Sequence, residues 1–225
     1  MVSAIVLAAG AGKRLKSGVS KPLVKIAKRA AIIYSLEVLD KHFSINEIIV
    51  VVSSGNQKQI KEIVDNCFFK KITHFVMGGK RRQDSVNNGL KAVSLNSDFI
   101  LIHDAARPFI DSKAITKVIQ AAKISGAAIL GVPVKATIKR VKRSGLVDQT
   151  LDRNNLWEIQ TPQVFKKELI FKAYKKFSKN NVTDDAALIE KLGENVKIVL
   201  GSYENIKITT YDDLLFAQTI ARSKS

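Results

Sequence analysis

The chain has 225 residues, of which 46% are hydrophobic, which is enough for one large domain with a sizeable core. Its single cysteine, Cys67, excludes an intramolecular disulfide, and the neighbours Phe68 and Phe69 predict a buried structural thiol. The formal net charge of +17 would suit nucleic-acid binding, but the lysines are spread along the chain, with neither zinc-finger spacing nor an aromatic and basic stacking motif.

The first 134 residues alternate between predicted strands and helices. Continuous apolar runs predict strands at residues 3–8, 47–53, 72–77, 98–104 and 127–134. Apolar residues at helical spacing predict helices at residues 30–43, 56–69, 81–93 and 112–126. This alternation indicates an α/β domain with a mostly parallel sheet, which binds its ligands at the carboxyl ends of the strands. The N-terminal apolar run follows no basic segment and is too short to cross a membrane, so we expect a cytoplasmic protein.

The alternation stops near Val134. Residues 134–156 combine β-forming and charged residues around a Ser144–Gly145 turn, which predicts a projecting hairpin. Because an isolated hairpin is only marginally stable, we expect this β-arm to pack on a partner chain. Helices are predicted at residues 166–177, 184–193 and 211–223, the last capped by Thr209 or Thr210, and strands at residues 196–201 and 205–209. We therefore treat residues 1–225 as a single domain that carries an arm.

The stretch "LAAGAGKRLKSGVSKP", residues 7–22, places small residues and several bases directly after the first strand. Such a loop lets backbone amides approach a phosphate, although a strand-to-helix turn with solvated bases would look similar. The spacing excludes a Walker A loop, because Arg14 stands where Ser or Thr is required. It also excludes the dinucleotide fingerprint, because Leu15 stands at the third glycine.

Two further motifs follow later strands. In "GGKRRQDSVNNGL", residues 78–90, a glycine pair allows close backbone approach, and Arg81, Arg82 and Ser85 stand at a predicted helix start, where anions bind well. In "HDAARP", residues 103–108, Asp104 ends a buried strand and is placed to hold Mg²⁺. The alternatives are a simple helix cap for the first motif and an Asp104–Arg107 ion pair for the second.

Two motifs in the C-terminal third complete the set. "LDRNNLWEIQTPQVF", residues 151–165, contains the only tryptophan, and "GSYENIKITTYDDL", residues 201–214, places Lys207 between two isoleucines. Lys207 could extend its ammonium harmlessly to solvent or point toward the ligand as a phosphate clamp. His103 is interpreted as structural, because the three histidines share no metal-binding spacing.

Taken together and in this order, the five motifs resemble the 2-C-methyl-D-erythritol 4-phosphate cytidylyltransferase family, which makes CDP-methylerythritol in the non-mevalonate route to isoprenoids. The resemblance implies a Rossmann-like nucleotidyltransferase fold in three layers with a projecting β-arm. It also implies a homodimer in which the arm of one subunit completes the site of the other. CTP and methylerythritol phosphate would be the substrates, with Mg²⁺ as the cofactor.

The resemblance assigns roles to the matching positions. Arg14 and Lys21 would stabilise the triphosphate and the transition state, and Asp104 would hold Mg²⁺. The CTP site would be lined by Ala8, Ala9, Gly10, Gly12, Gly79 and Ser85. The methylerythritol phosphate would be held by Thr137, Lys207 and Arg153 from the partner's arm, with Thr161 and Thr183 as further candidates.

The sequence departs from the family pattern at two places. Pro22 and Leu23 follow Lys21 where the family usually has Gln and an aromatic residue, and Lys80 stands where an acidic residue is frequent. The implied chemistry is in-line attack of the substrate phosphate on the α-phosphorus of CTP, which requires no general base because a phosphate monoester is already largely ionised near pH 7. The alternatives are a ribitol-5-phosphate cytidylyltransferase and, in another class, a basic nucleic-acid-binding protein.

Overall fold

A seven-stranded sheet forms the centre of the protein in the computed structural model, which describes residues 1–10 and 20–224. The strands are β1 (Val2–Leu7), β4 (Glu47–Val52), β5 (Ile72–Met77), β6 (Phe99–Asp104), β7 (Ala127–Pro133), β10 (Trp157–Lys166) and β11 (Lys197–Leu200). Their order across the sheet is β11-β7-β10-β6-β1-β4-β5. Of these described strands, only β10 runs antiparallel to its neighbours, β6 and β7. The mostly parallel sheet predicted from the alternating pattern is therefore confirmed.

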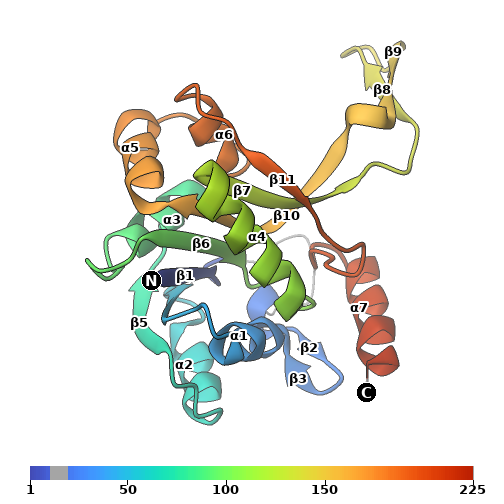
Figure 1. Cartoon of the computed structure of the whole chain (residues 1–225). Coiled ribbons are helices and arrows are strands. Elements are labelled where there is room, and N and C mark those ends of the chain that lie inside the picture. The colour runs from blue at the N-terminus through green and yellow to red at the C-terminus, as the bar shows by residue number, and fades with distance from the viewer. Residues whose placement is uncertain (11–19, 225) are drawn as a thin grey trace.

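Helices cover both faces of this sheet (Figure 1). One face packs against α1 (Ala31–Lys41), α2 (Gln57–Asp65) and α4 (Ser112–Ser125). The other packs against α3 (Arg82–Leu90), α5 (Lys167–Phe177) and α6 (Ala186–Glu190). All six residues of β4 are buried, as expected for a strand covered on both sides. The chain therefore has the three-layer α/β architecture expected from its sequence.

A smaller third core lies beside the C-terminal helix α7 (Tyr211–Ser223). Ile26, Phe109 and Ile208 are buried there against the helix, next to the short strands β2 (Lys25–Ile26) and β3 (Arg29–Ala30). Thr210 caps α7 by accepting a hydrogen bond from the Asp213 N–H, as predicted. This packing fixes the segment before α7, which includes Lys207.

The strand order reverses at β1, and a binding crevice is expected beside this reversal. β1 pairs with β4 on one side and with β6 on the other, and Leu7 lies opposite Asp104 at the carboxyl ends of β1 and β6. In open α/β sheets, ligands bind outside the strand ends at such a reversal. The loop after β1 and the end of β6 are thus neighbours at the predicted rim.

The predicted hairpin is present and projects away from the body of the protein (Figure 1). It consists of β8 (Ile138–Val141) and β9 (Val147–Leu151), followed by the 3₁₀ helix η3 (Arg153–Asn155). Gly145 sits in the connecting turn with a φ of +83°, a conformation that favours glycine. The residues of the hairpin are mostly exposed.

Three details differ from the expectations. Cys67 is exposed, because α2 ends at Asp65 and the following turn directs Phe68 outward. Among the described residues, 205–209 form no strand of the sheet, and the Ile208 N–H donates instead to the Ala106 carbonyl in the loop after β6. The ten-residue strand β10 was not predicted, since Pro162 interrupts its pattern and its pairing with β7 shifts between Ile159 and Gln163.

Candidate active site

Two adjoining cavities lie at the carboxyl ends of the strands. The first, of about 600 Å³, is bordered by β10, β11 and α6 and is called the β10 cavity. The second, of about 500 Å³, is lined by Ala9 and Gly10 after β1 and by Gly79 before α3, and is called the β1 cavity. Arg82, Asp104 and Lys207 line both, so these three side chains form the boundary between the cavities.

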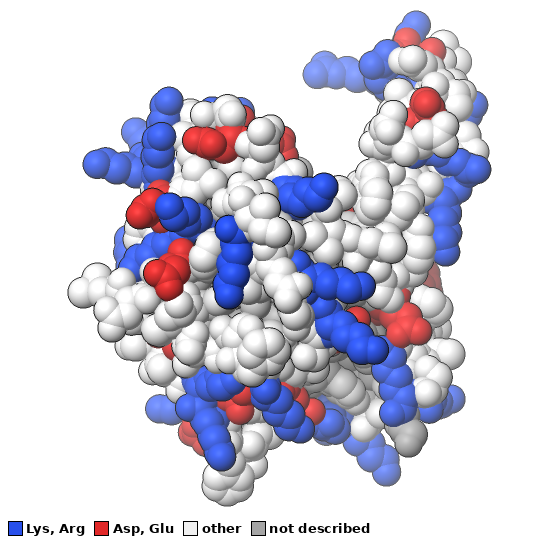
Figure 2. Space-filling model, viewed as in Figure 1, with Lys and Arg blue, Asp and Glu red and all other residues white. Residues whose placement is uncertain are grey.

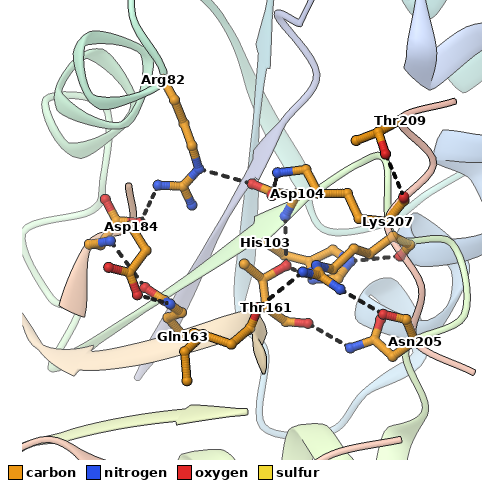
Figure 3. A network of polar contacts seen from close by, with 12 residues as sticks. Arg82, His103, Asp104, Thr161, Gln163, Asp184, Asn205, Lys207 and Thr209 are labelled. Carbon is orange, nitrogen blue, oxygen red and sulfur yellow. Dashed lines mark hydrogen bonds and ion pairs between the residues drawn. The ribbon is translucent and has the colours of Figure 1, made fainter. Parts of the chain in front are cut away.

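The boundary is an ion-paired cluster centred on Asp104 (Figure 3). Asp104 Oδ1 accepts a hydrogen bond from Arg82 Nε at 3.1 Å, and Oδ2 lies 2.5 Å from Lys207 Nζ. Burial alone would raise the pKa of the Asp104 carboxyl, but the charges of Arg82 and Lys207 outweigh it and hold that pKa well below its usual range. Asp104 is therefore ionised at neutral pH, and Lys207 points into the site rather than to solvent.

Arg82 connects Asp104 with a second buried carboxylate. Its Nη1 donates to Asp185 Oδ2 at 2.8 Å, and the Tyr174 hydroxyl donates to Asp185 Oδ1 at 2.5 Å. Burial would lower the pKa of the Arg82 guanidinium, but Asp185 and Asp104 raise it above its ordinary value. Gln163 on β10 accepts from the Asp185 N–H and donates to Asp184, which holds the chain before α6 against the sheet. Arg82 is thus a permanent cation with a fixed position.

A second chain of hydrogen bonds joins β6, β10 and the loop after β6. His103 Nε2 lies 3.0 Å from the Arg107 carbonyl oxygen, and His103 Nδ1 lies 3.0 Å from Thr161 Oγ1. Thr161 Oγ1 also accepts from the Asp104 N–H at 3.0 Å. Burial lowers the pKa of His103 to about 4, so its ring is neutral at pH 7. The network fixes Thr161 on the wall of the β10 cavity.

Close packing explains why the segment before α3 contains a glycine pair. A Cβ atom on Gly78 would lie 2.5 Å from Ala9 Cβ, and one on Gly79 would lie 2.3 Å from Asp84 Cβ. The Gly79 N–H donates to Ser85 Oγ, whose hydroxyl donates to the Arg81 carbonyl. Larger residues would therefore push the segment away from the loop after β1 and change the shape of the β1 cavity.

The structure tests whether the predicted metal position fits Mg²⁺. Among the described residues, no group of three or more His, Cys, Asp or Glu side chains is arranged to hold a metal ion. Mg²⁺ in phosphate-transfer sites, however, uses one or two protein carboxylates and takes its other ligands from phosphates and water. Asp104 is an ionised carboxylate beside the β1 cavity and fits that role, provided that Lys207 moves from Oδ2 when the ion binds.

Most of the predicted site residues converge on the two cavities. Ala9, Gly10, Lys21, Gly79 and Ser85 line the β1 cavity, Thr161 and Thr183 line the β10 cavity, and Asp104 and Lys207 line both. Ala8 lines neither cavity, because it is fully buried in the core and its N–H donates to the Val51 carbonyl. Gly12 and Arg14 lie outside the described residues.

Two predicted residues lie on the arm instead. Thr137 and Arg153 are both exposed there, and Arg153 Nη1 donates to the Lys135 carbonyl. Neither lines the β1 or the β10 cavity of the same chain. The structure therefore places these two residues apart from the others that were predicted to hold the substrate.

Two arginines that line the β10 cavity were not expected there. From the sequence, Arg82 was placed at a helix start where anions bind, and Arg107 was considered only as an ion-pair partner of Asp104. The guanidinium of Arg107 instead donates to the carbonyls of Asn205 and Ile159, while Arg82 and Lys207 pair with Asp104. Burial lowers the pKa of Arg107, and its Nε has no hydrogen-bond partner among the described residues. The "RRQ" segment, which contains Arg82, and the "AARP" segment, which contains Arg107, were the sequence signals that could have assigned them to the site.

Comparisons with known proteins agree with this geometry. Residues 2–223 match the family model of 2-C-methyl-D-erythritol 4-phosphate cytidylyltransferase (IspD). A protein of that name from Clostridioides difficile (strain 630) is 43% identical over 222 residues, covering 98% of this chain and 93% of that protein. These findings give no support to the ribitol 5-phosphate and nucleic-acid alternatives, and Figure 2 shows basic side chains scattered over the visible face.

Solved structures with the same arrangement include two related enzymes. The 4-diphosphocytidyl-2C-methyl-D-erythritol synthase from Anaerococcus prevotii DSM 20548 has a TM-score of 0.88 and 35% identity, over 99% of this chain and 96% of that one. The 2-C-methyl-D-erythritol 4-phosphate cytidylyltransferase from Thermus thermophilus has a TM-score of 0.81 and 28% identity, over 99% of this chain and 100% of that one. No helix within the described residues has the length and apolar character needed to span a bilayer. The chain belongs to the 2-C-methyl-D-erythritol 4-phosphate cytidylyltransferase family.

Proposed function

We propose that this chain joins CTP and 2-C-methyl-D-erythritol 4-phosphate into CDP-methylerythritol and pyrophosphate, in the cytoplasm and on the route to isoprenoids. The observation that carries the proposal is the pair of cavities that share Arg82, Asp104 and Lys207. A reaction between two phosphate-bearing substrates needs two adjoining sites and a shared cationic boundary where the reacting phosphates meet. Family membership over residues 2–223 supports the same reaction.

The β1 cavity suits CTP. Its glycine pair and the small residues after β1 permit backbone groups to approach a nucleotide closely, and Lys21 supplies a cation at its wall. Ala9, Gly10 and Gly12 would line the triphosphate, and Gly79 and Ser85 would contact the cytosine. Ala8 is fully buried, with its N–H and carbonyl bonded to Val51 and Asn56, and so would support this loop rather than touch CTP. Because Ser85 already donates its proton to Arg81, its oxygen would receive a hydrogen bond from the base. An amino group, which cytosine carries, is a suitable donor.

The β10 cavity suits a polyol phosphate because basic and acidic side chains both line it. Arg82, Arg107 and Lys207 supply positive charge near the boundary. Asp184 and Glu190 line the same cavity and are suitable acceptors for hydroxyl groups. A phosphate would therefore lie at the boundary with its polyol directed toward α6, where Thr183 also stands.

The chemistry follows from these positions. A phosphate oxygen of the second substrate attacks the α-phosphorus of CTP in line, and the bond from that phosphorus to the β-phosphate breaks to release pyrophosphate. The attacking phosphate is largely ionised near pH 7, so no side chain needs to remove a proton. Lys21, Arg14 and Lys207 stabilise the negative charge that spreads in the transition state. Mg²⁺ held by Asp104 would neutralise further charge on the triphosphate when it is bound.

We further propose that the active form is a homodimer. Thr137 and Arg153 lie on the arm and away from the cavities of their own chain, which supports delivery to the partner's site. The arm also exposes Val141, Leu146 and Val147, apolar residues that a second subunit would cover. The substrate phosphate would then be held by Lys207 of one subunit and by Arg153 of the other.

The proposal is tested by pyrophosphate release from CTP and Mg²⁺, with methylerythritol phosphate and ribitol 5-phosphate assayed in parallel. Release with methylerythritol phosphate alone supports the proposal. Release with ribitol 5-phosphate alone would retain the fold and mechanism but overturn the substrate. Lys21→Ala should lower turnover by at least ~10²-fold, the scale for losing one preorganised donor, and near-normal turnover would remove Lys21 from the mechanism.

A further inference from the structure

His103 has hydrogen-bond partners on both sides of its ring, although no role has been given to it in the reaction. Its side chain is completely buried at the end of β6, directly before Asp104. Nε2 lies 3.0 Å from the Arg107 carbonyl oxygen, and Nδ1 lies 3.0 Å from Thr161 Oγ1 (Figure 3). The ring therefore connects three segments that each contribute a residue to the β10 cavity.

The chemistry of the partners fixes the direction of these bonds. A carbonyl oxygen only accepts, so Nε2 must carry a hydrogen and donate it to Arg107. Among the described residues, the other partner of the Thr161 hydroxyl is a donor, the Asp104 N–H, so His103 Nδ1 is the acceptor that the contacts offer to the hydroxyl hydrogen. Nδ1 consequently accepts, and the Thr161 hydroxyl is the donor in that contact.

This assignment uses most of the hydrogen-bonding capacity of Thr161. A threonine hydroxyl can donate once and accept twice. The Thr161 hydroxyl donates to His103 Nδ1 and accepts from the Asp104 N–H at 3.0 Å. The hydroxyl of this cavity-lining residue therefore has one acceptor position left and no donor.

We propose that His103 is a positioning residue that makes Thr161 an acceptor-only contact, so that Thr161 receives a hydroxyl group of the substrate's polyol and does not hold its phosphate. A phosphate oxygen is itself an acceptor and would face a lone pair at Thr161. The phosphate is directed instead to the cations Lys207, Arg82 and Arg107 on the same cavity wall. This orients the substrate with its hydroxyl groups toward Thr161. The part of the inference that concerns the substrate rests on the proposed function.

The hydrogen-bond assignment is tested without any substrate, by ¹⁵N NMR of the histidine rings in the wild-type chain. The chain has three histidines, and the signals of His42 and His74 are assigned with the variants His42→Gln and His74→Gln, which leaves His103 unaltered. We expect a protonated Nε2 and an unprotonated Nδ1 for His103. A proton on Nδ1, whether in the other tautomer or in the imidazolium, would free the Thr161 hydroxyl to donate and would overturn the inference.

The consequence for binding is tested by steady-state kinetics. His103→Leu removes the acceptor at Nδ1, and we expect the KM for methylerythritol phosphate to rise about tenfold, the scale of one net hydrogen bond, while the KM for CTP stays near its wild-type value. His103→Asn places an oxygen near the Nδ1 position and should recover most of that loss. A merely structural role would instead raise both KM values together, without recovery by Asn, and that result would overturn the inference.

A second pair of variants keeps the inference testable if position 103 does not tolerate change. Thr161→Val removes the oxygen and should raise the KM for methylerythritol phosphate, whereas Thr161→Ser retains it and should recover most of the loss. An unaltered KM in Thr161→Val would overturn the inference. If the wild type does not turn over methylerythritol phosphate, the proposed function fails, and the NMR result still decides the state of His103.

Discussion

Lys207 Nζ lies 2.5 Å from Asp104 Oδ2, so a cation from the segment before α7 is held at the carboxyl end of β6. Both residues line both cavities, and their contact therefore stands where the two substrates would meet. Removing Lys207 would take away the cation that we propose as a phosphate ligand and would leave Asp104 with Arg82 as its remaining ion-pair partner among the described residues.

We predict that Lys207→Met lowers kcat/KM for methylerythritol phosphate by at least ~10²-fold, because a preorganised charge at the reacting phosphate is lost. Lys207→Arg retains the charge and should be less impaired. Lys224→Met is the matched control, since Lys224 forms an exposed pair with Glu204 away from the cavities. A Lys207→Met enzyme within a few-fold of the wild type would contradict the role given to this lysine.

Gly79→Ala should weaken CTP binding. The new Cβ would lie 2.3 Å from Asp84 Cβ and 3.2 Å from the Asp84 backbone carbon, so the first turn of α3 must shift. We expect the KM for CTP to rise at least ~10-fold and the free energy of unfolding to fall by ~1–3 kcal/mol, the usual cost of overpacking. Gly55→Ala is the control, because a Cβ there meets nothing within 4 Å. Unchanged CTP kinetics in Gly79→Ala would show that this segment does not shape the nucleotide site.

The proposed exchange of arms predicts complementation between two inactive variants. Arg153→Ala and Lys207→Ala chains are co-expressed with different tags, and the mixed dimer is isolated with both tags. If the arm acts on the partner, the mixed dimer has one intact site out of two, and its activity is half that of the wild type. If each arm served its own chain, both sites of the mixed dimer would be defective, and activity would stay at the level of the parent variants.

The buried histidines predict a dependence of stability on pH. Burial lowers the pKa of His103 to about 4 in the folded chain, whereas an unfolded histidine has a pKa of ~6.5. Between these values the unfolded chain binds more protons, so stability is full above pH ~6.5 and falls as the pH decreases toward 4. At ~1.4 kcal/mol per pH unit, the loss due to His103 approaches ~3 kcal/mol.

Urea unfolding between pH 7 and pH 4 measures this loss, with His103→Gln as the reference. His42, whose pKa burial also lowers, contributes a change of the same sign in both proteins. The wild type should therefore lose stability more steeply than His103→Gln over this range. The Asp104 carboxylate, with its pKa held below the usual range, starts to lose its contribution near the ordinary pKa of ~3.9, at the acid end of this range, and does so in both proteins. If the free energy of unfolding fell equally steeply with pH in the two proteins, the lowered pKa of His103 would be contradicted.

The elements that position the site were largely predictable from local patterns. The run from Phe99 to His103 identified a buried strand, and the position of Asp104 at its end placed a carboxylate at the rim. The glycine pair before α3 indicated the close backbone approach that is observed. β10 could not be predicted in this way, because its centre contains Gln160, Pro162 and Gln163, and its burial comes from tertiary packing against β6, β7 and the flanking helices.

The contacts between distant segments could not be read from the sequence. Arg107 lies three residues after Asp104 and was the natural partner by proximity, but Lys207, 103 residues away, and Arg82 on α3 occupy the carboxylate instead. Lys207 could have extended to solvent or pointed toward the ligand. The choice depends on the path of the segment before α7, which crosses the loop after β6. Cys67 was expected to be buried because its aromatic neighbours are apolar, yet α2 ends before it and the turn exposes it.

The central claim is that a phosphate oxygen of the second substrate attacks the α-phosphorus of CTP. It is tested most directly with methylerythritol phosphate labelled with ¹⁸O at the three peripheral phosphate oxygens, followed by ³¹P NMR of the products. The account predicts that the product retains all the label, with one ¹⁸O bridging to the phosphorus of the cytidylyl group, and that pyrophosphate carries none. Label in pyrophosphate, or a product without an ¹⁸O bridge, would contradict it.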